Sequence, residues 1–270
     1  MIDKDTQLCI SVASRPSNFG TTLHNAAYAA LGLNFVYNAC ADSHIAGAIA
    51  GVRALGNRGC SVSMPFKQAV VPCLDALDRT AREIGAVNTV VNDRGVLTGY
   101  NTDVVGARRA LQQLAPRPDE RVLVLGAGGA ARAVLFALRE LGMHRVAVAA
   151  RDGARLEPLR SILPFRSIAW AQRQRDGADV LVNATPVGMR PDDQSMPVDE
   201  AFLDGCRAVM DVVISPMETK LIGCATAKGK LVAPGYLMSL EQAMAQFTLY
   251  AGVDAPRAVM ERHMRELLDQ

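Results

Sequence analysis

A glycine-rich turn constrains the fold of this 270-residue chain more than any other feature of its sequence. The turn, Gly126–Ala131, follows an apolar run at Val122–Leu125 and leads into an amphipathic segment at Ala130–Leu141. A second apolar run at Val146–Ala150 completes a strand-helix-strand pattern, because short apolar runs bounded by turn residues are typical of buried strands. This order predicts the opening β-α-β unit of a Rossmann-type dinucleotide-binding domain.

The turn has the pattern G-x-G-x-x-A, and each small residue has a physical reason in such a unit. Gly126 permits the tight turn, Gly128 lets the backbone approach a pyrophosphate, and Ala131 lets the helix pack closely on the strand. The N-terminus of the helix then faces the anion. We therefore predict cofactor contacts from Gly126, Ala127, Gly128, Gly129 and Ala130.

The end of the second strand bears on the choice between NADP and NAD. An acidic residue there accepts a hydrogen bond from the ribose 2′-hydroxyl of NAD, whereas arginine accommodates the 2′-phosphate of NADP. This chain has both signals, since Asp152 follows Arg151 directly and Arg155 lies one turn further on. If Asp152 is instead the N-cap of the next helix, the two guanidiniums remain for the phosphate. We predict NADP, bound by Arg151 and Arg155, with NAD as the less favoured alternative.

Short apolar runs also alternate with amphipathic segments before a proline-marked segment at Ala115–Glu120, which we interpret as a candidate domain boundary. Strands are expected at Leu8–Val12 and Cys60–Val62. A helix is expected to begin at His24, where capping or packing explains the histidine better than catalysis does. The alternation predicts an α/β fold with parallel strands and helices on both faces. Further helices are expected at Val104–Leu114, Leu237–Tyr250 and Ala255–Leu268.

Composition excludes several classes of protein. The chain has 29 basic and 27 acidic residues, so it lacks the overall positive charge that would attract nucleic acid or anionic lipid. The cysteines form no C-x-x-C pair and the histidines no metal-binding spacing, so we expect no metal site. The start, Met1–Asp5, lacks the features of a signal peptide, and no apolar run approaches the ~18 residues of a membrane helix. We expect a cytoplasmic protein with a small-molecule substrate and no membrane partner.

Three strand-to-turn segments in the first half end in small polar or charged residues. The first, Gly59–Lys67, delivers a lysine in a chain whose basic residues are nearly all arginine. The others are Gly85–Thr89 and Gly99–Asp103. These segments are typical of the walls of a binding site. For Lys67 and Asp103 the alternative interpretation is a surface salt bridge.

At these residues the chain resembles the shikimate dehydrogenase family, whose motifs include N-V-T-x-P-x-K, G-A-x-N-T, G-x-N-T-D and G-A-G-G-A. The family's N-A-T-P-x-G-M motif stands at Asn183–Met189, and its late glutamine is Gln242. The resemblance spans the chain. It implies a two-domain α/β architecture, in which residues 1–103 form a substrate-binding and catalytic domain completed by residues 237–270. Residues 104–236 would form the NADP-binding Rossmann domain.

The resemblance also implies an activity, the oxidation of shikimate by NADP⁺ to 3-dehydroshikimate and NADPH, or the reverse, in the biosynthesis of aromatic amino acids. Lys67 and Asp103 fit the family's catalytic pair. The chemistry agrees, because a group must take the hydroxyl proton as hydride leaves the carbinol carbon. The implied substrate contacts are Ser63, Asn88, Gln242, Thr21 and Thr22. The implied cofactor contacts outside the glycine turn are Thr185, Gly188, Met189, Val213 and Gly235.

The departures from the family concern the substrate pocket. The family's S-x-S-P, which holds the substrate carboxylate, falls on Asn18–Thr21, where neither serine is present. The family's substrate tyrosine appears as Val213, and Ser61 and Ser63 replace the asparagine and threonine before the lysine. These changes resemble a divergent shikimate dehydrogenase-like branch. The hydroxyls left for the carboxylate are those of Ser17, Thr21 and Thr22.

Other functions remain open from the sequence. The chain is consistent with a related dehydrogenase that prefers another polyol ring acid, such as quinate or an aminoshikimate. A different reductase with the same cofactor domain, or a non-catalytic NADP or metabolite sensor, would also carry the Gly126 turn. Lys67 and Asp103 together favour an enzyme. A monomer and a homodimer are both compatible with the sequence.

Overall fold

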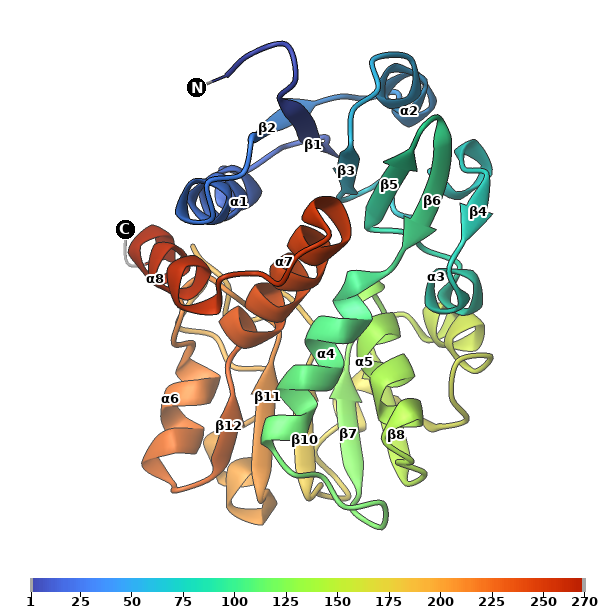
Figure 1. Cartoon of the computed structure of the whole chain (residues 1–270). Helices are drawn as coiled ribbons and strands as arrows, with labels where there is room; N and C mark the ends of the chain where they lie inside the picture. Colours follow the sequence, from blue (N-terminus) through green and yellow to red (C-terminus); the bar gives the residue numbers. More distant parts are fainter. Residues whose placement is uncertain (1, 269–270) are drawn as a thin grey trace. The chain divides into compact units, whose positions relative to one another are not determined.

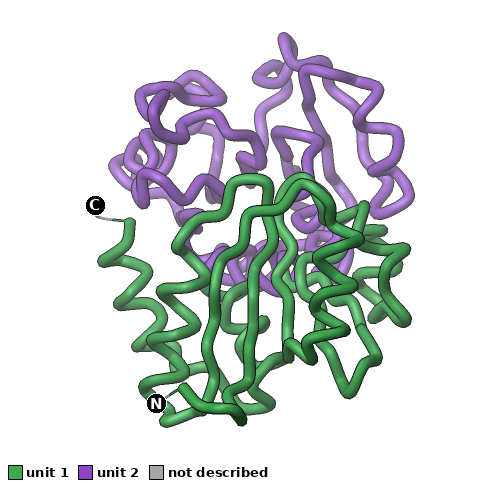
Figure 2. Tube along the Cα trace, turned by 90° about the horizontal axis from the view of Figure 1, so that it is seen from above, with its two compact units in different colours: residues 1–102, 240–268, 270 green, residues 103–239, 269 purple. Residues whose placement is uncertain are grey.

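A computed structural model of the chain describes residues 2–268, which form two compact units. The first unit comprises residues up to 102 together with 240–268, and the second comprises residues 103–239 (Figure 2). Two helices, α4 (Thr102–Gln113) and α7 (Gly235–Ala251), carry the chain from one unit into the other. The first unit is therefore built from two stretches that are far apart in the sequence.

The first unit contains a six-stranded sheet with the order β2-β1-β3-β5-β6-β4 (Figure 1). Its strands are β1 (Gln7–Ala13), β2 (Phe35–Ala41), β3 (Gly59–Val62), β4 (Ala76–Leu77), β5 (Thr89–Asp93) and β6 (Val96–Tyr100). Strands β1, β2 and β3 are parallel, but β5 is antiparallel to both of its neighbours. The expectation of wholly parallel strands is wrong for this unit. Arg94 and Gly95 have φ values of 54° and 92°, which suits the two-residue turn of a hairpin and leaves no room for a crossover helix.

Helices cover both faces of this sheet. They are α1 (Phe19–Ala30), α2 (Ile45–Ala54), α3 (Arg79–Ile84), α8 (Arg257–Leu268), the later part of α7 and the short 3₁₀ helix η1 (Val71–Cys73). On one face Ile49 and Val52 of α2 join an apolar cluster with strand residues. On the other face, aromatic rings from α1, β2 and α7 pack against one another.

Helix α1 begins at Phe19, so the expectation that it begins at His24 is wrong. The amide of Thr22 donates to the carbonyl of Asn18 at 2.8 Å, which places the polar residues before His24 within the first helical turn. His24 consequently lies inside the helix and packs rather than caps.

The second unit has the predicted Rossmann fold, with a parallel sheet of order β12-β11-β10-β7-β8-β9. Its strands are β7 (Val122–Leu125), β8 (Val146–Ala150), β9 (Arg166–Ala169), β10 (Val180–Asn183), β11 (Ala208–Asp211) and β12 (Leu231–Ala233). Its helices, besides α4, are α5 (Gly129–Glu140), α6 (Lys220–Ala227), η2 (Gly153–Leu159), η3 (Trp170–Gln172) and η4 (Glu200–Gly205). Every residue of β7, β10 and β11 is buried, as in a sheet covered on both faces.

The proline-marked segment Ala115–Glu120 lies inside the second unit and is not a boundary between units. Arg207, directly before β11, donates to the carbonyl of Leu114 at 2.9 Å and to the carboxylate of Glu120 at 2.8 Å. These bonds tie the end of α4 to the parallel sheet, which explains why α4 belongs with the unit that follows it. None of the described helices is long and apolar enough to cross a membrane.

Candidate functional site

The topology of the first sheet brings the sequence motifs to one edge. Because β1 is parallel to β3, and β5 is antiparallel to both β3 and β6, the carboxyl ends of β1, β3 and β6 share an edge. Lys67 follows β3, Asn88 directly precedes β5, and Thr102 follows β6. Asp103 is the next residue along the chain, in the first turn of α4. Lys67 and Thr102, which are 35 residues apart in the sequence, therefore lie at one edge of the sheet.

Asn88 fixes the start of helix α4. Its Oδ1 accepts hydrogen bonds from the Thr102 amide at 2.8 Å and from the Thr89 hydroxyl at 2.9 Å, and its Nδ2 lies 3.0 Å from the Thr102 hydroxyl. All three side chains are buried. Since Thr102 precedes Asp103, these bonds also fix the backbone from which the Asp103 carboxylate extends. A direct contact between Asn88 and substrate stays a prediction.

Two glutamines on α7 join the same network. Gln242 donates to the Thr102 hydroxyl at 3.3 Å. Gln246 donates to the hydroxyls of Ser61 and Thr89, each at 2.9 Å. The sequence reasoning named Gln242 and missed Gln246. A signal was available, because residues four apart share one face of a helix.

A cavity of about 160 Å³ lies at this edge, within the first unit. One wall is the segment that links β1 to α1 and includes Arg15, and Ser63 and Gln242 line other parts. These last two are predicted substrate contacts, so the structure brings them to one cavity. The predicted contacts Asn88, Thr21 and Thr22 are not among its lining residues. The Thr21 hydroxyl is buried and has no hydrogen-bond partner among the described residues.

His24 and Tyr37 are the aromatic residues that stack at this cavity. Their rings are 4.5 Å apart and inclined by 5°. Burial lowers the pKa of His24 to about 4, with a smaller opposing effect from Gln246, so the imidazole is neutral at pH 7. A Cβ at Gly20 would lie 3.0 Å from Cε1 and the hydroxyl oxygen of Tyr37. A serine at position 20 would therefore need the outer end of the Tyr37 ring to shift by a few tenths of an ångström.

The turn between β7 and α5 is suited to a pyrophosphate. Gly126 has a φ of 114°, and a Cβ there would lie 2.6 Å from the carbonyl oxygen of Ala184. Gly128 is the N-cap of α5 without a side-chain hydrogen bond to the helix. A Cβ at Gly128 or Gly129 would meet no atom within 4 Å. The start of this twelve-residue helix thus has open space beside it, as anion binding at a helix N-terminus requires.

A buried carboxylate anchors the loops that follow β10 and β11. Asp211 accepts from Asn183 Nδ2 at 3.0 Å, from the Val213 amide at 3.0 Å and from the Thr219 hydroxyl at 2.7 Å. Asn183 Oδ1 in turn accepts from the Thr185 hydroxyl at 2.6 Å. Burial raises the pKa of Asp211 to about 6, although these donors oppose the shift. The sequence analysis did not identify Asp211. It could have been found as an acidic residue at the end of an otherwise apolar strand.

The remaining predicted cofactor residues lie on the same edge of the parallel sheet. Gly188 and Met189 follow β10, and the Met189 side chain is exposed. Gly235 follows β12, and a Cβ there would lie 2.2 Å from the Val213 carbonyl oxygen. Close backbone packing therefore explains this glycine by itself. Contacts of these residues with NADP stay predictions.

The segment after β8 has the predicted capping arrangement. Asp152 is the N-cap of η2, and its Oδ1 accepts from the Ala154 amide at 3.0 Å. Arg151 and Arg155 are exposed, and neither guanidinium forms an ion pair or hydrogen bond with any residue between 2 and 268. The two cations are thus available to a ligand.

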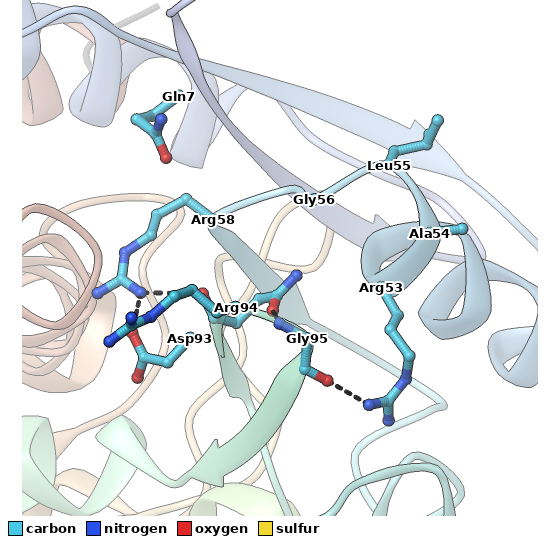
Figure 3. A pocket seen from close by; sticks show the side chains of 10 residues that line it. Gln7, Arg53, Ala54, Leu55, Gly56, Arg58, Asp93, Arg94 and Gly95 are labelled. Atoms are coloured by element: carbon cyan, nitrogen blue, oxygen red, sulfur yellow. Dashed lines mark hydrogen bonds and ion pairs between the residues drawn. The ribbon is translucent and has the colours of Figure 1, made fainter.

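A second hollow, of about 670 Å³, lies at the opposite edge of the first sheet (Figure 3). Two of its three arginines are already engaged, and the third, Arg94, is exposed in the hairpin turn. Arg53 pairs with Asp75 at 2.8 Å, while Arg58 pairs with Asp93 and donates to the carbonyl of Tyr250 at 2.9 Å. Because Arg53 and Arg58 hold the protein together here, and the sequence motifs meet at the other edge, we place the candidate site at the carboxyl edge.

Comparison with known proteins gives the family. A family described as the shikimate dehydrogenase substrate binding domain matches residues 18–90. A shikimate dehydrogenase-like protein of Haemophilus influenzae is 42% identical over 252 residues, which are 93% of this chain and 92% of the relative. The chain belongs to the shikimate dehydrogenase family. An NADP⁺ shikimate dehydrogenase of Moorella thermoacetica is 40% identical over 91% of this chain and 88% of its own length.

Solved structures of shikimate dehydrogenase-family proteins have the same fold. Shikimate 5-dehydrogenase from Thermus thermophilus, in complex with NADP(H) and shikimate, superposes with a TM-score of 0.85 at 33% identity, over 97% of this chain and 99% of that one. Quinate dehydrogenase from Corynebacterium glutamicum, in complex with NAD, has a TM-score of 0.90 at 30% identity, with the same coverage of 97% and 99%. The predicted family and α/β fold class are confirmed.

Proposed function

We propose that this protein is an NADP-dependent shikimate dehydrogenase that oxidises a ring hydroxyl of shikimate to give 3-dehydroshikimate and NADPH. The observation that carries the proposal is the meeting of Lys67, Asn88 and Thr102 at one sheet edge, beside a polar cavity. The relative from Moorella thermoacetica, named as an NADP⁺ shikimate dehydrogenase, supports the same assignment.

The residues present suit NADP. When bound, NADP⁺ supplies the hydride acceptor. The start of α5 would hold the pyrophosphate, and Arg151 with Arg155 would hold the 2′-phosphate through charge-assisted hydrogen bonds. The loop that contains Thr185 would contact the nicotinamide end, and the Asp211 network keeps that loop ordered.

Lys67 and Asp103 have the proton-transfer roles in this proposal. Lys67 Nζ accepts the proton of the reacting hydroxyl as the carbinol C–H bond breaks, and then releases it to water. Asp103 orients the resulting ammonium through its negative charge. The hydrogen bonds between Asn88 and Thr102 hold the backbone next to Asp103 in place, so that the carboxylate needs little reorganisation.

A second candidate is a dehydrogenase for quinate or an aminoshikimate. It is favoured by the altered segment at Asn18–Thr21, where Tyr37 occupies the space beside Gly20. The TM-score of 0.90 with a quinate dehydrogenase is compatible with it. A catalytically silent NADP-binding protein is the third candidate.

One assay separates the three candidates. NADPH formation is followed by absorbance at saturating NADP⁺ with shikimate, quinate and aminoshikimate, and NAD⁺ is tested in parallel. We expect the highest kcat/KM with shikimate and NADP⁺. A higher value with quinate or aminoshikimate would establish the second candidate. NADP⁺ binding without turnover of any of these acids would establish a sensor.

The proposal includes a cytoplasmic location and a monomeric or homodimeric state. It is supported by six free cysteines, several of them buried, because reduced thiols are usual in the cytoplasm. Sedimentation of the purified protein at several concentrations would measure the oligomeric state.

A further inference from the structure

The cavity in the first unit has an unusual charge pattern. Arg15 is the one Arg or Lys among its lining residues, and no Asp or Glu lines it. His24, the other titratable base there, is neutral at pH 7 because it is fully buried. The other polar lining groups are hydroxyls and amides, such as those of Ser17, Ser63 and Gln242. A ligand that matches this lining carries one negative charge and several hydroxyl groups.

Arg15 is available to such a ligand. It lies two residues beyond the end of β1, at the same sheet edge as Lys67. Within residues 2–268 its side chain forms no ion pair or hydrogen bond. By contrast, Arg53 and Arg58 at the opposite edge of this sheet are each paired with a carboxylate. A cation at the cavity wall without a protein partner is free to pair with a ligand anion.

The altered segment after Arg15 lacks the serines that hold the substrate carboxylate in the family, so another group must bind that carboxylate. The two serines that hold the carboxylate in the family are replaced by Asn18 and Gly20. A Cβ at position 20 would lie 3.0 Å from the Tyr37 ring, so restoring a serine there would also require a shift of that ring. Replacing two neutral donors by one guanidinium still gives two parallel N–H donors to a carboxylate.

We propose that Arg15 binds the ring carboxylate of the substrate and thereby selects hydroxylated ring monocarboxylates over neutral ring polyols. The inference rests on the proposed dehydrogenase function for its turnover test, but it makes a separate claim about binding. Arg15 is a specificity-determining residue in this proposal, because it touches the carboxylate and not the carbon that is oxidised.

The test compares Arg15→Gln with Arg15→Lys and with a matched control, Arg94→Gln, whose exposed arginine lines the opposite hollow. Shikimate and its uncharged methyl ester are used as substrates with saturating NADP⁺. We expect Arg15→Gln to raise KM for shikimate about tenfold or more and to change kcat less than about threefold. Arg15→Lys should recover part of the loss, and Arg94→Gln should match wild type. With the methyl ester, KM should be the same in wild type and Arg15→Gln.

An unchanged KM for shikimate in Arg15→Gln, or equal losses with acid and ester, would overturn the role of Arg15 while leaving the dehydrogenase assignment intact. Calorimetric titration of shikimate into the NADP⁺ complex measures binding when the wild type shows no turnover. If the wild type binds shikimate without oxidising it and Arg15→Gln binds it more weakly, the proposed function is refuted and the carboxylate site is supported. If wild type bound neither shikimate nor quinate, both proposals would fail.

Discussion

At the amino edges of the two sheets most arginines are paired with carboxylates, Arg94 and Arg145 being exceptions. At the carboxyl edges Arg15, Arg151 and Arg155 have no such partner among the described residues. The amino-edge pairs in the first sheet are Arg53–Asp75 and Arg58–Asp93. In the second sheet they include Arg121–Asp179, at 2.8 Å, Arg166–Asp176, at 2.7 Å, and Arg207–Glu120.

The difference separates cations that hold the fold from cations that are available to ligands. Arg121 donates to Asp179 and to the carbonyl of Asp176, so it links the starts of neighbouring strands. An exposed guanidinium without a partner loses little hydration, so leaving it unpaired has little effect on stability. The same group gains strong hydrogen bonds when an anion arrives. The comparison predicts that substitutions at carboxyl edges change binding and catalysis, while those at amino edges change stability.

The largest effect is expected at Lys67. Lys67→Ala should lower kcat by roughly 10²-fold or more and barely change NADP⁺ affinity, because proton transfer is lost while the cofactor site is intact. Asp103→Asn should act in the same direction. Steady-state kinetics with shikimate and fluorescence titration of NADPH measure the two quantities. Turnover close to that of wild type in Lys67→Ala would require another proton acceptor.

The next effect is expected at Arg151, with Arg166 as the amino-edge control. A charged hydrogen bond contributes about 1.5–3 kcal/mol, so Arg151→Ala should weaken NADP⁺ by roughly ten- to a hundredfold and leave NAD⁺ nearly unchanged. Added salt should reproduce part of the loss in wild type. Dissociation constants for both cofactors are measured by calorimetry.

For Arg166→Ala we expect unchanged affinity for both cofactors, since its partner is Asp176. Equal losses of NAD⁺ and NADP⁺ in Arg151→Ala, or a wild type that prefers NAD⁺, would show that Arg151 does not read the 2′-phosphate.

The smallest effect is expected at Arg121. Its hydrogen bonds hold the pKa of Asp179 below the ordinary value, and Arg121 is 45% exposed, so screening limits its contribution. Arg121→Gln should lower the free energy of unfolding at pH 7 by about 1 kcal/mol or less and leave kcat/KM unchanged. Because the folded pKa of Asp179 is lowered, this contribution is present above the unfolded pKa and is lost as pH falls through the folded one.

Urea unfolding at pH 7 and at pH 3 measures the effect of Arg121→Gln. The variant and wild type should differ less at pH 3 than at pH 7. A loss of NADP⁺ affinity in Arg121→Gln would contradict the claim that amino-edge arginines affect stability and not ligand binding.

The Rossmann unit was predictable to a large extent from local patterns. Strands β7 and β8 have the bounds that their apolar runs indicate, and α5 begins within one residue of the expected position. In such a unit the glycine turn and the neighbouring apolar strands are close in the sequence, and both favour the same β-α-β structure. The hairpin of β5 and β6 was also encoded locally, by Arg94-Gly95, but strand-helix alternation elsewhere favoured a parallel arrangement.

The sequence by itself determined the family motifs, the cofactor-type turn and the residues proposed for catalysis, because each lies in a short segment with a recognisable pattern. Only the tertiary structure decided which of them share a cavity and which distant residues support them. The Tyr37 ring beside Gly20, the anchoring of two loops by Asp211, and the position of Arg15 at the cavity wall all join residues from different strands and helices. Such contacts follow from sheet order and packing, which short-range propensities do not specify.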